Sequence, residues 1–311
     1  MAEPLIWERE GADWPNRASS RFVQAAGLRW HVQVTGTGPP LLLLHGTGAS
    51  SHSWRDMLPL LARHFQVVAP DLPGHAFTDR PAPNRLSLTG MAAAVTSLLG
   101  ALEISPSVVV GHSAGAAVLV RMCLERNIAP RALVSLNGAL LPLPGLPGMV
   151  FSPLAKLLSQ FDLVPRMFAR HAAVEPMVPR LLQDTGSALD PTGVDLYRRL
   201  ASNPQHVGAA LDMVAHWDLS QLKNELSHLT TPLLLVTGRN DKTIPPAASH
   251  AVRALLPKAG IVNLPGLGHL AHEERPRLLA ALLIRVGRSC GKCRAKWIPP
   301  HHYQIPHDAM R

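Results

Sequence analysis

Short apolar runs alternate with longer amphipathic segments along most of the chain. The runs are rich in Leu and Val and nearly continuous, which is typical of strands buried on both faces of a parallel sheet. This alternation predicts an α/β fold, with a mostly parallel central sheet flanked by helices. Strands are expected at 28–34, 40–45, 66–70, 108–111, 132–137, 233–237 and 260–264, and helices at 53–63, 88–102, 114–126, 247–256 and 273–287.

The alternation stops between about Leu140 and Thr230, where the sequence has only helix-like pieces punctuated by Pro and Gly. Because the strand pattern resumes afterwards, we expect a helical lid inserted into one domain, over the carboxyl ends of the strands. A separate helical domain with its own partner is the alternative. The expected organisation is a core in two parts (1–139 and 232–287), a lid (140–231) and a basic, poorly ordered Cys/His-rich tail (288–311).

Composition narrows the class of protein. The net charge of +9 comes from 30 Lys and Arg against 21 Asp and Glu, but the basic residues are scattered, so no nucleic-acid partner is expected. Three cysteines suit a reducing compartment. The start of the chain lacks the apolar segment of a signal peptide, and no apolar run reaches the length of a spanning helix. We therefore expect a soluble, cytoplasmic protein.

The stretch VVVGHSAGAAV, residues 108–118, has the G-x-S-x-G pattern at the end of a predicted strand and the start of a predicted helix. This is the context of a nucleophile elbow, in which a sharp turn exposes the serine at a helix N-terminus. A Gly-Ser-Gly turn also occurs for purely structural reasons. The flanking strand and helix favour Ser113 as a nucleophile.

A serine nucleophile needs a base and an acid, which in this layout follow it along the chain as acid and then histidine. Asp241 follows the predicted strand at 233–237, and His269 follows the one at 260–264. Asp241 could instead cap a turn, and His272 is a rival base. The alternative acid position, after the strand that precedes the insertion, has Asn137 and no carboxylate, which favours Asp241.

The oxyanion of an acyl-transfer intermediate needs two N–H donors. One is expected from Ala114, directly after the serine. The other is expected from Thr47, in the His-Gly-Thr-Gly stretch that follows the strand at 40–45, although that stretch could also be a simple glycine turn.

These motifs, together with PDLPGHAFTD and GLGHLAHEERP, make the chain resemble the α/β-hydrolase superfamily from about Ser20 to Gly287. Stretches such as HGTGASSHSWRDMLPLLA and GHSAGAAVLVRMCL are most similar to the magnesium-chelatase accessory proteins of bacteriochlorophyll biosynthesis. Ser113, His269 and Asp241 predict a serine hydrolase that cleaves an ester or related acyl bond. The resemblance does not itself reveal a reaction, but it implies a role in bacteriochlorophyll synthesis, with a tetrapyrrole intermediate as substrate and magnesium chelatase as partner.

Other functions stay open at this point. A non-catalytic tetrapyrrole binder would use the apolar lid residues Met149, Phe151, Phe161, Met167 and Phe168, which would equally suit an ordinary core. A carbon–carbon bond hydrolase is a further alternative. Such enzymes usually carry Trp after the catalytic histidine, and Leu270 at that position counts modestly against this class. Haloalkane dehalogenases and epoxide hydrolases need Asp at the nucleophile position, so Ser113 excludes both.

No cofactor and no metal are expected. A zinc site in the tail would need Cys290 and Cys293 with His301, His302 or His307, a weak pattern because the histidine spacing is irregular. Contact of an amphipathic lid face with a membrane is an alternative that we do not expect.

Overall fold

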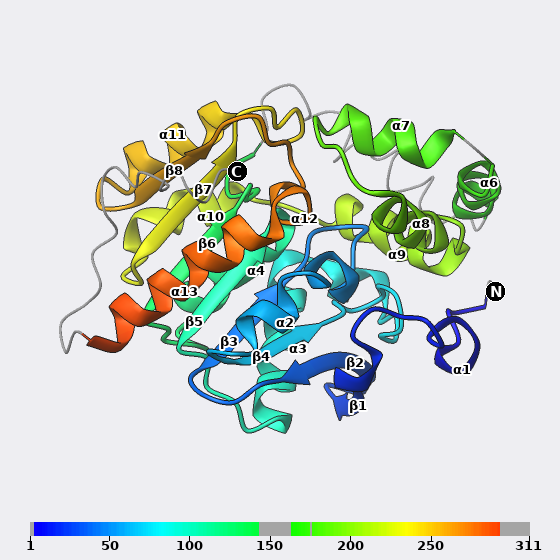
Figure 1. Cartoon of the computed structure of the whole chain (residues 1–311), viewed down its shortest axis with the longest axis horizontal. Helices are drawn as coiled ribbons and strands as arrows, with labels where there is room; N and C mark the ends of the chain where they lie inside the picture. Colours follow the sequence, from blue (N-terminus) through cyan, green and yellow to red (C-terminus); the bar gives the residue numbers. More distant parts are fainter. Residues whose placement is uncertain (1–2, 143–162, 175, 293–311) are drawn as a thin grey trace.

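The computed structural model describes residues 3–142, 163–174 and 176–292. They form an eight-stranded sheet in the order β1-β2-β4-β3-β5-β6-β7-β8. All neighbouring pairs from β4 to β8 are parallel, and β1 and β2 join antiparallel at one edge, so the predicted α/β fold with a mostly parallel sheet is confirmed (Figure 1). The strands are β1 (Ser20–Ala25), β2 (Leu28–Thr35), β3 (Pro40–Leu44), β4 (Gln66–Pro70), β5 (Val108–His112), β6 (Ala132–Leu136), β7 (Leu233–Gly238) and β8 (Gly260–Leu264).

Strand β1 was not among the expected strands. It pairs only with β2, at the edge of the sheet, and its side chains are at most half-buried, so it lacks the continuous apolar run that marks the others. The two strands are joined by Ala26 and Gly27, both with positive φ, which is the geometry of a type I′ hairpin turn.

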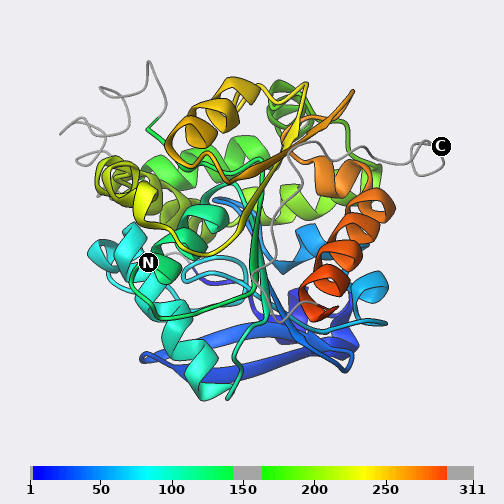
Figure 2. The same ribbon diagram turned by 90° about the vertical axis from the view of Figure 1, so that its left-hand side faces the viewer.

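Each face of the sheet is buried under a helical layer (Figure 2). Leu42 and Leu44 of β3 contribute to one apolar cluster, while Leu41 and Leu43 contribute to the other, as the two-residue period of a strand requires. The first layer contains α3 (Leu88–Ala101), α4 (Ala114–Leu124), α10 (Ser220–Glu225) and α11 (Pro246–Leu255), and the second contains α2 (Leu58–Leu61) and α13 (Pro276–Lys292).

Two expected helices differ from the structure. The segment 53–63 forms a 3-10 turn (Ser51–Trp54) and the short α2, because Pro59 lacks the N–H that a continuous helix needs. The segment 273–287 is split by Pro276 into α12 (Ala271–Glu274) and α13. Helix α13 continues past Gly287 to Lys292, so the first residues of the expected tail are helical. Gly287 packs against the Phe65 ring, which leaves no space for a side chain.

Between β6 and β7, the described residues of the insertion are mainly helical. Before α10 it contains α6 (Leu163–Ala172), α7 (Met177–Asp184), α8 (Pro191–Ala201) and α9 (Pro204–Ala215), which lie together at one end of the sheet (Figure 1). A short helix α1 (Trp7–Glu10) lies near the start of the chain. None of the helices in the described part of the chain is long and apolar enough to cross a bilayer.

Six histidines in the described part of the chain are buried and have a lowered pKa. The main cause in each is loss of solvent, which disfavours the charged imidazolium. Burial lowers the pKa of His206 to about 4 and that of His272 to about 3. The six are His45, His52, His75, His112, His206 and His272.

The sheet core predicts a clear difference between two leucine truncations. Leu42→Ala, at a fully buried position in the middle of β3, is expected to lower the free energy of unfolding by about 2–5 kcal/mol. Leu255→Ala, at the exposed end of α11, is expected to cost less than about 1 kcal/mol. Urea unfolding followed by circular dichroism measures both, and equal losses would contradict the assigned core.

The buried histidines predict acid sensitivity. Below pH 6.5 the unfolded chain binds protons at these histidines that the folded chain does not bind, so stability falls as the pH falls, by at most roughly 1.4 kcal/mol per histidine per pH unit. Glu273 acts in the opposite direction, since burial raises its pKa to about 7. We expect a much lower urea midpoint at pH 5.5 than at pH 7.5. An unchanged midpoint would contradict the neutral, buried imidazoles.

His272→Phe is the matched variant for this effect. The His272 ring packs on Trp54 and His112, and neither of its nitrogens has a hydrogen-bond partner among the described residues, so a phenyl ring can take its place. The variant should lose less stability than the wild type between pH 7.5 and 5.5. A loss equal to that of the wild type would show that His272 does not contribute.

Candidate active site

Ser113 occupies a strained turn between β5 and α4. Its φ of 50° and ψ of −118° lie in a region that non-glycine residues rarely adopt. The surrounding backbone holds it there, because its N–H donates to the Leu136 carbonyl at 3.1 Å and its carbonyl accepts from Ala116 and Ala139. Unlike its neighbours on both sides, Ser113 is only partly buried. The turn therefore has the backbone form of a nucleophile elbow.

The two glycines around Ser113 are required by space. A Cβ on Gly111 would lie 2.4 Å from the Ala116 nitrogen, and a Cβ on Gly115 would lie 2.4 Å from the Leu44 carbonyl oxygen. The absence of both side chains lets α4 begin directly against β5 and β3. Close packing of backbone atoms thus requires both glycines of the G-x-S-x-G pattern in this chain.

Asp241 lies on the loop after β7, and its carboxylate is buried and fully hydrogen-bonded. One oxygen, Oδ1, accepts from the backbone N–H groups of Thr243 and Ile244, each at 2.8 Å. The other, Oδ2, accepts from His269 Nδ1 at 2.9 Å and from Asn137 Nδ2 at 2.6 Å. These bonds fix the orientation of the carboxylate.

The loop after β8 brings His269, and not the rival His272, to this carboxylate. His269 donates through Nδ1, so the neutral imidazole has its lone pair on Nε2, which is the tautomer a general base needs. His272 lies in the apolar layer against Trp54, and burial lowers its pKa to about 3. Only His269 therefore has the partner that would orient it.

The residue beside the serine connects the elbow to His269. His112 Nε2 donates to the His269 carbonyl at 3.0 Å, and the two imidazole rings have centroids 4.7 Å apart. Ser113, Asp241 and His269 thus lie at the carboxyl ends of β5, β7 and β8. Asp241 is hydrogen-bonded to both His269 and Asn137, and Ser113 is linked to His269 through its neighbour His112.

Both expected oxyanion donors lie at this edge. Ala114 is the first residue of α4, so its N–H has no acceptor within the helix. The loop of Thr47 follows β3, and a Cβ on Gly46 would lie 2.9 Å from Ser113 Cβ, which shows how closely that loop approaches the serine. His45 holds the loop, since its Nδ1 donates to the Gly46 carbonyl at 2.8 Å.

Helix α9 of the insertion packs over the same loop. His206 Nε2 donates to the Gly48 carbonyl at 3.1 Å, and Thr47 Oγ1 lies 3.5 Å from Met213 Sδ. The insertion thus reaches the side of the site where an oxyanion would form.

Sequence reasoning missed the contributions of Asn137, His112 and His45. In the sequence Asn137 marks only a position without a carboxylate, yet in the structure its amide donates to Asp241 from a backbone with φ 47°. That Asn tolerates positive φ better than most residues is the one local signal that pointed to it.

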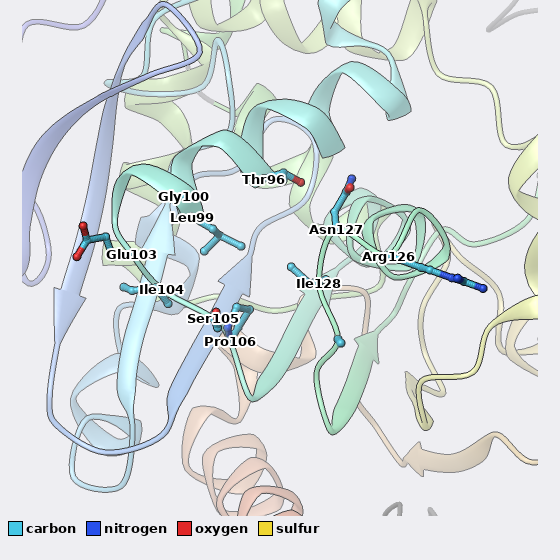
Figure 3. Close-up of a pocket in the computed structure, with 11 residues that line it drawn as sticks. Thr96, Leu99, Gly100, Glu103, Ile104, Ser105, Pro106, Arg126, Asn127 and Ile128 are labelled. Atoms are coloured by element: carbon cyan, nitrogen blue, oxygen red, sulfur yellow. The ribbon is translucent and has the colours of Figure 1, made fainter.

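A pocket of about 500 Å³ lies near the amino-terminal ends of β5 and β6, opposite the ends that carry the candidate site (Figure 3). It is formed by the end of α3, the residues before β5 and those before β6, including Leu99, Glu103, Pro106, Arg126 and Ile128. Ser113 lies at the other end of β5, so this pocket is separate from the candidate site.

The apolar residues considered for a flat tetrapyrrole ligand differ in their burial. Met167 is on the surface and about half exposed, whereas Phe168 packs with Leu270 and the α7 residues Val178 and Leu182. Met149, Phe151 and Phe161 lie outside the described residues. Phe168 is thus partly buried against a core cluster, and Met167 faces solvent.

No group of three or more His, Cys, Asp and Glu side chains within 3–142, 163–174 and 176–292 is arranged to hold a metal ion. The tail zinc hypothesis falls on Cys293, His301, His302 and His307, which lie outside the described residues, as does the side chain of Cys290.

Comparison with known proteins identifies the family and supports the fold. Residues 41–282 match the model of the alpha/beta hydrolase family. The magnesium-chelatase 30 kDa subunit of Rhodobacter capsulatus is 36% identical over 275 residues, which cover 88% of this chain and 96% of that protein. Haloalkane dehalogenase 2 of Mycobacterium tuberculosis is 28% identical, over 86% of this chain and 95% of that protein.

Solved structures share the fold. An α/β hydrolase fold protein from Burkholderia ambifaria has a TM-score of 0.71 and 25% identity, covering 86% of this chain and 99% of that one. A putative lipase from Acinetobacter baumannii has a TM-score of 0.75 over 94% and 98% of the two chains, and its 17% identity shows the fold alone. With its sheet order, its serine turn and the family match over most of its length, the chain belongs to the α/β hydrolase family.

Proposed function

We propose that the protein is a serine hydrolase that cleaves an ester or related acyl bond with Ser113, His269 and Asp241. The observation that carries the proposal is the buried hydrogen bond between Asp241 Oδ2 and His269 Nδ1, next to a serine held in an elbow. A carboxylate at Nδ1 leaves Nε2 as the proton acceptor and stabilises the imidazolium that forms.

The proposed chemistry follows from these roles. Ser113 Oγ attacks the carbonyl carbon of the substrate while His269 Nε2 takes its proton. The negative oxygen of the tetrahedral intermediate accepts hydrogen bonds from the N–H groups of Thr47 and Ala114. The imidazolium then protonates the leaving alcohol or thiol, and a water molecule hydrolyses the acyl-enzyme by the same steps.

In this proposal the helical insertion, residues 140–231, is a lid over the site. The contacts of α9 with the loop of Thr47 and Gly48 support that role. Such a cover would exclude bulk water, which strengthens the electrostatic interactions at the reacting carbonyl.

The biological role that we propose is that of a magnesium-chelatase accessory protein in bacteriochlorophyll biosynthesis. It is supported by 36% identity to the Rhodobacter capsulatus magnesium-chelatase 30 kDa subunit over nearly the whole of that protein. A small molecule, a tetrapyrrole intermediate, is then the proposed substrate, and magnesium chelatase is the proposed partner.

A non-catalytic function on the same fold is the second candidate. It is favoured by one observation, that this relative is named for a chelatase subunit and not for a hydrolase. In that case the protein would hold a tetrapyrrole or dock on the chelatase without turnover. The two candidates differ in whether Ser113 is a reactive nucleophile.

A fluorophosphonate probe separates the two. The wild type is expected to become labelled at one serine, and Ser113→Ala is expected to abolish the labelling, because the probe reacts with serines activated by a base. Ser97→Ala, which removes an exposed serine on α3, is the control and should label normally. An unreactive wild type would favour the binder.

Accumulated pigment intermediates test the cellular role. In a strain that lacks the gene, we expect an intermediate near the magnesium-insertion step to accumulate, and the wild-type gene to restore the pigment. A Ser113→Ala copy is expected not to restore it if turnover matters. Full restoration by the Ser113→Ala copy would contradict a catalytic role in this pathway.

A further inference from the structure

The connection between α7 and α8 touches both loops that carry the acid and the base. Its first residue, Thr185, accepts two backbone hydrogen bonds through one carbonyl oxygen. One comes from the N–H of Lys242, next to Asp241, at 3.1 Å, and the other from the N–H of His269 at 3.4 Å. A single oxygen of the insertion therefore joins the two loops.

A second bond fixes the base loop from its other side. The buried Ser187 hydroxyl accepts from the N–H of Leu270 at 2.8 Å. Glu274 completes the contact, since its carboxylate accepts from Gly268 at 2.7 Å and from Ala188 at 3.4 Å. The backbone N–H groups of His269 and of Leu270, the next residue, thus both donate to the insertion.

Between these bonds the backbones are in direct contact. Gly186 has a φ of +83°, and a Cβ there would lie 1.9 Å from the Asn240 carbonyl oxygen. Gly268, next to His269, is equally restricted, because its Cβ would lie 2.3 Å from Gly186. No side chain fits at either position, so at these two glycines the insertion and the loops pack backbone against backbone.

We infer that residues 185–187, which we call the 185–187 bracket, position Asp241 and His269 relative to each other. The inference rests on the proposed function only for the roles of these two residues. The bracket itself is defined by the hydrogen bonds of Thr185 and Ser187 and by the close approach of Gly186. The insertion is therefore part of the support of the acid–base pair, in addition to any role as a cover. Its residues are positioning residues that act through His269 and Asp241.

Gly186→Ala tests the bracket. The new methyl group would displace the bracket from the acid loop, and a displacement of about 1 Å can reduce reactivity ~100-fold. We expect fluorophosphonate labelling of Ser113 to slow at least about tenfold. The downfield proton resonance of His269 Nδ1–H, which reports its bond to Asp241 directly, should move upfield or disappear.

Gly27→Ala is the matched control. Gly27 has a φ of +73° and nothing within 4 Å of the added Cβ, so the substitution brings the same backbone strain without a clash, far from the site. It should leave both the labelling rate and the resonance unchanged. A Gly186→Ala protein that matches Gly27→Ala in both measurements would overturn the inference.

Ser187→Ala covers the case in which Gly186→Ala does not fold. It removes one hydrogen bond from the base loop, and we expect labelling to slow about fivefold, with a shifted Nδ1 resonance. Ser107→Ala, which removes a serine hydroxyl bonded to Pro40 at the opposite end of β5, should change neither. Wild-type behaviour of Ser187→Ala would overturn the inference.

The resonance also separates this inference from the proposed function. If the wild-type serine does not react with the probe, the proposed function fails, while the Nδ1 resonance in Gly186→Ala and Ser187→Ala still shows whether the bracket holds the pair together.

Discussion

The buried carboxylate of Asp241 is the interaction on which the site depends. A carboxylate without solvent needs donors for both oxygens, and this one has the side chains of His269 and Asn137 and two backbone N–H groups of its own loop. The ends of β6, β7 and β8 are therefore joined through one side chain. Loss of any donor leaves a buried charge incompletely satisfied, so the position of His269 is coupled to the folding of this whole edge of the sheet.

Much of this arrangement could be predicted from the sequence, because it is encoded locally. The strand runs are continuous and apolar, the serine has its two glycines, and the acid and histidine each follow a strand that ends at the same edge. The parallel sheet then brings together residues as distant as Ser113 and His269. The sequence pattern thus predicts which strand each of the three candidate catalytic residues follows.

The remainder depends on contacts between distant segments that leave no periodic signal. Nothing in the sequence around Thr185 or Ser187 shows that they bond the loops after β7 and β8, and Asn137 is an ordinary polar residue after a strand. Strand β1 escaped prediction because its side chains are exposed in part at the sheet edge. The continuous helix expected at 53–63 does not form, because Pro59 cannot donate the backbone hydrogen bond that it would need.

The fold alone does not decide the reaction, since proteins similar to this chain over most of its length are named as a chelatase subunit and as a haloalkane dehalogenase. The decisive measurement is the rate at which a fluorophosphonate inactivates Asp241→Asn compared with the wild type. The account predicts a folded variant whose Ser113 reacts more slowly than in the wild type by a factor on the order of 10³ or more, since an amide would hold His269 in the wrong tautomer. A variant that reacts at the wild-type rate would contradict the claim that this carboxylate orients the base.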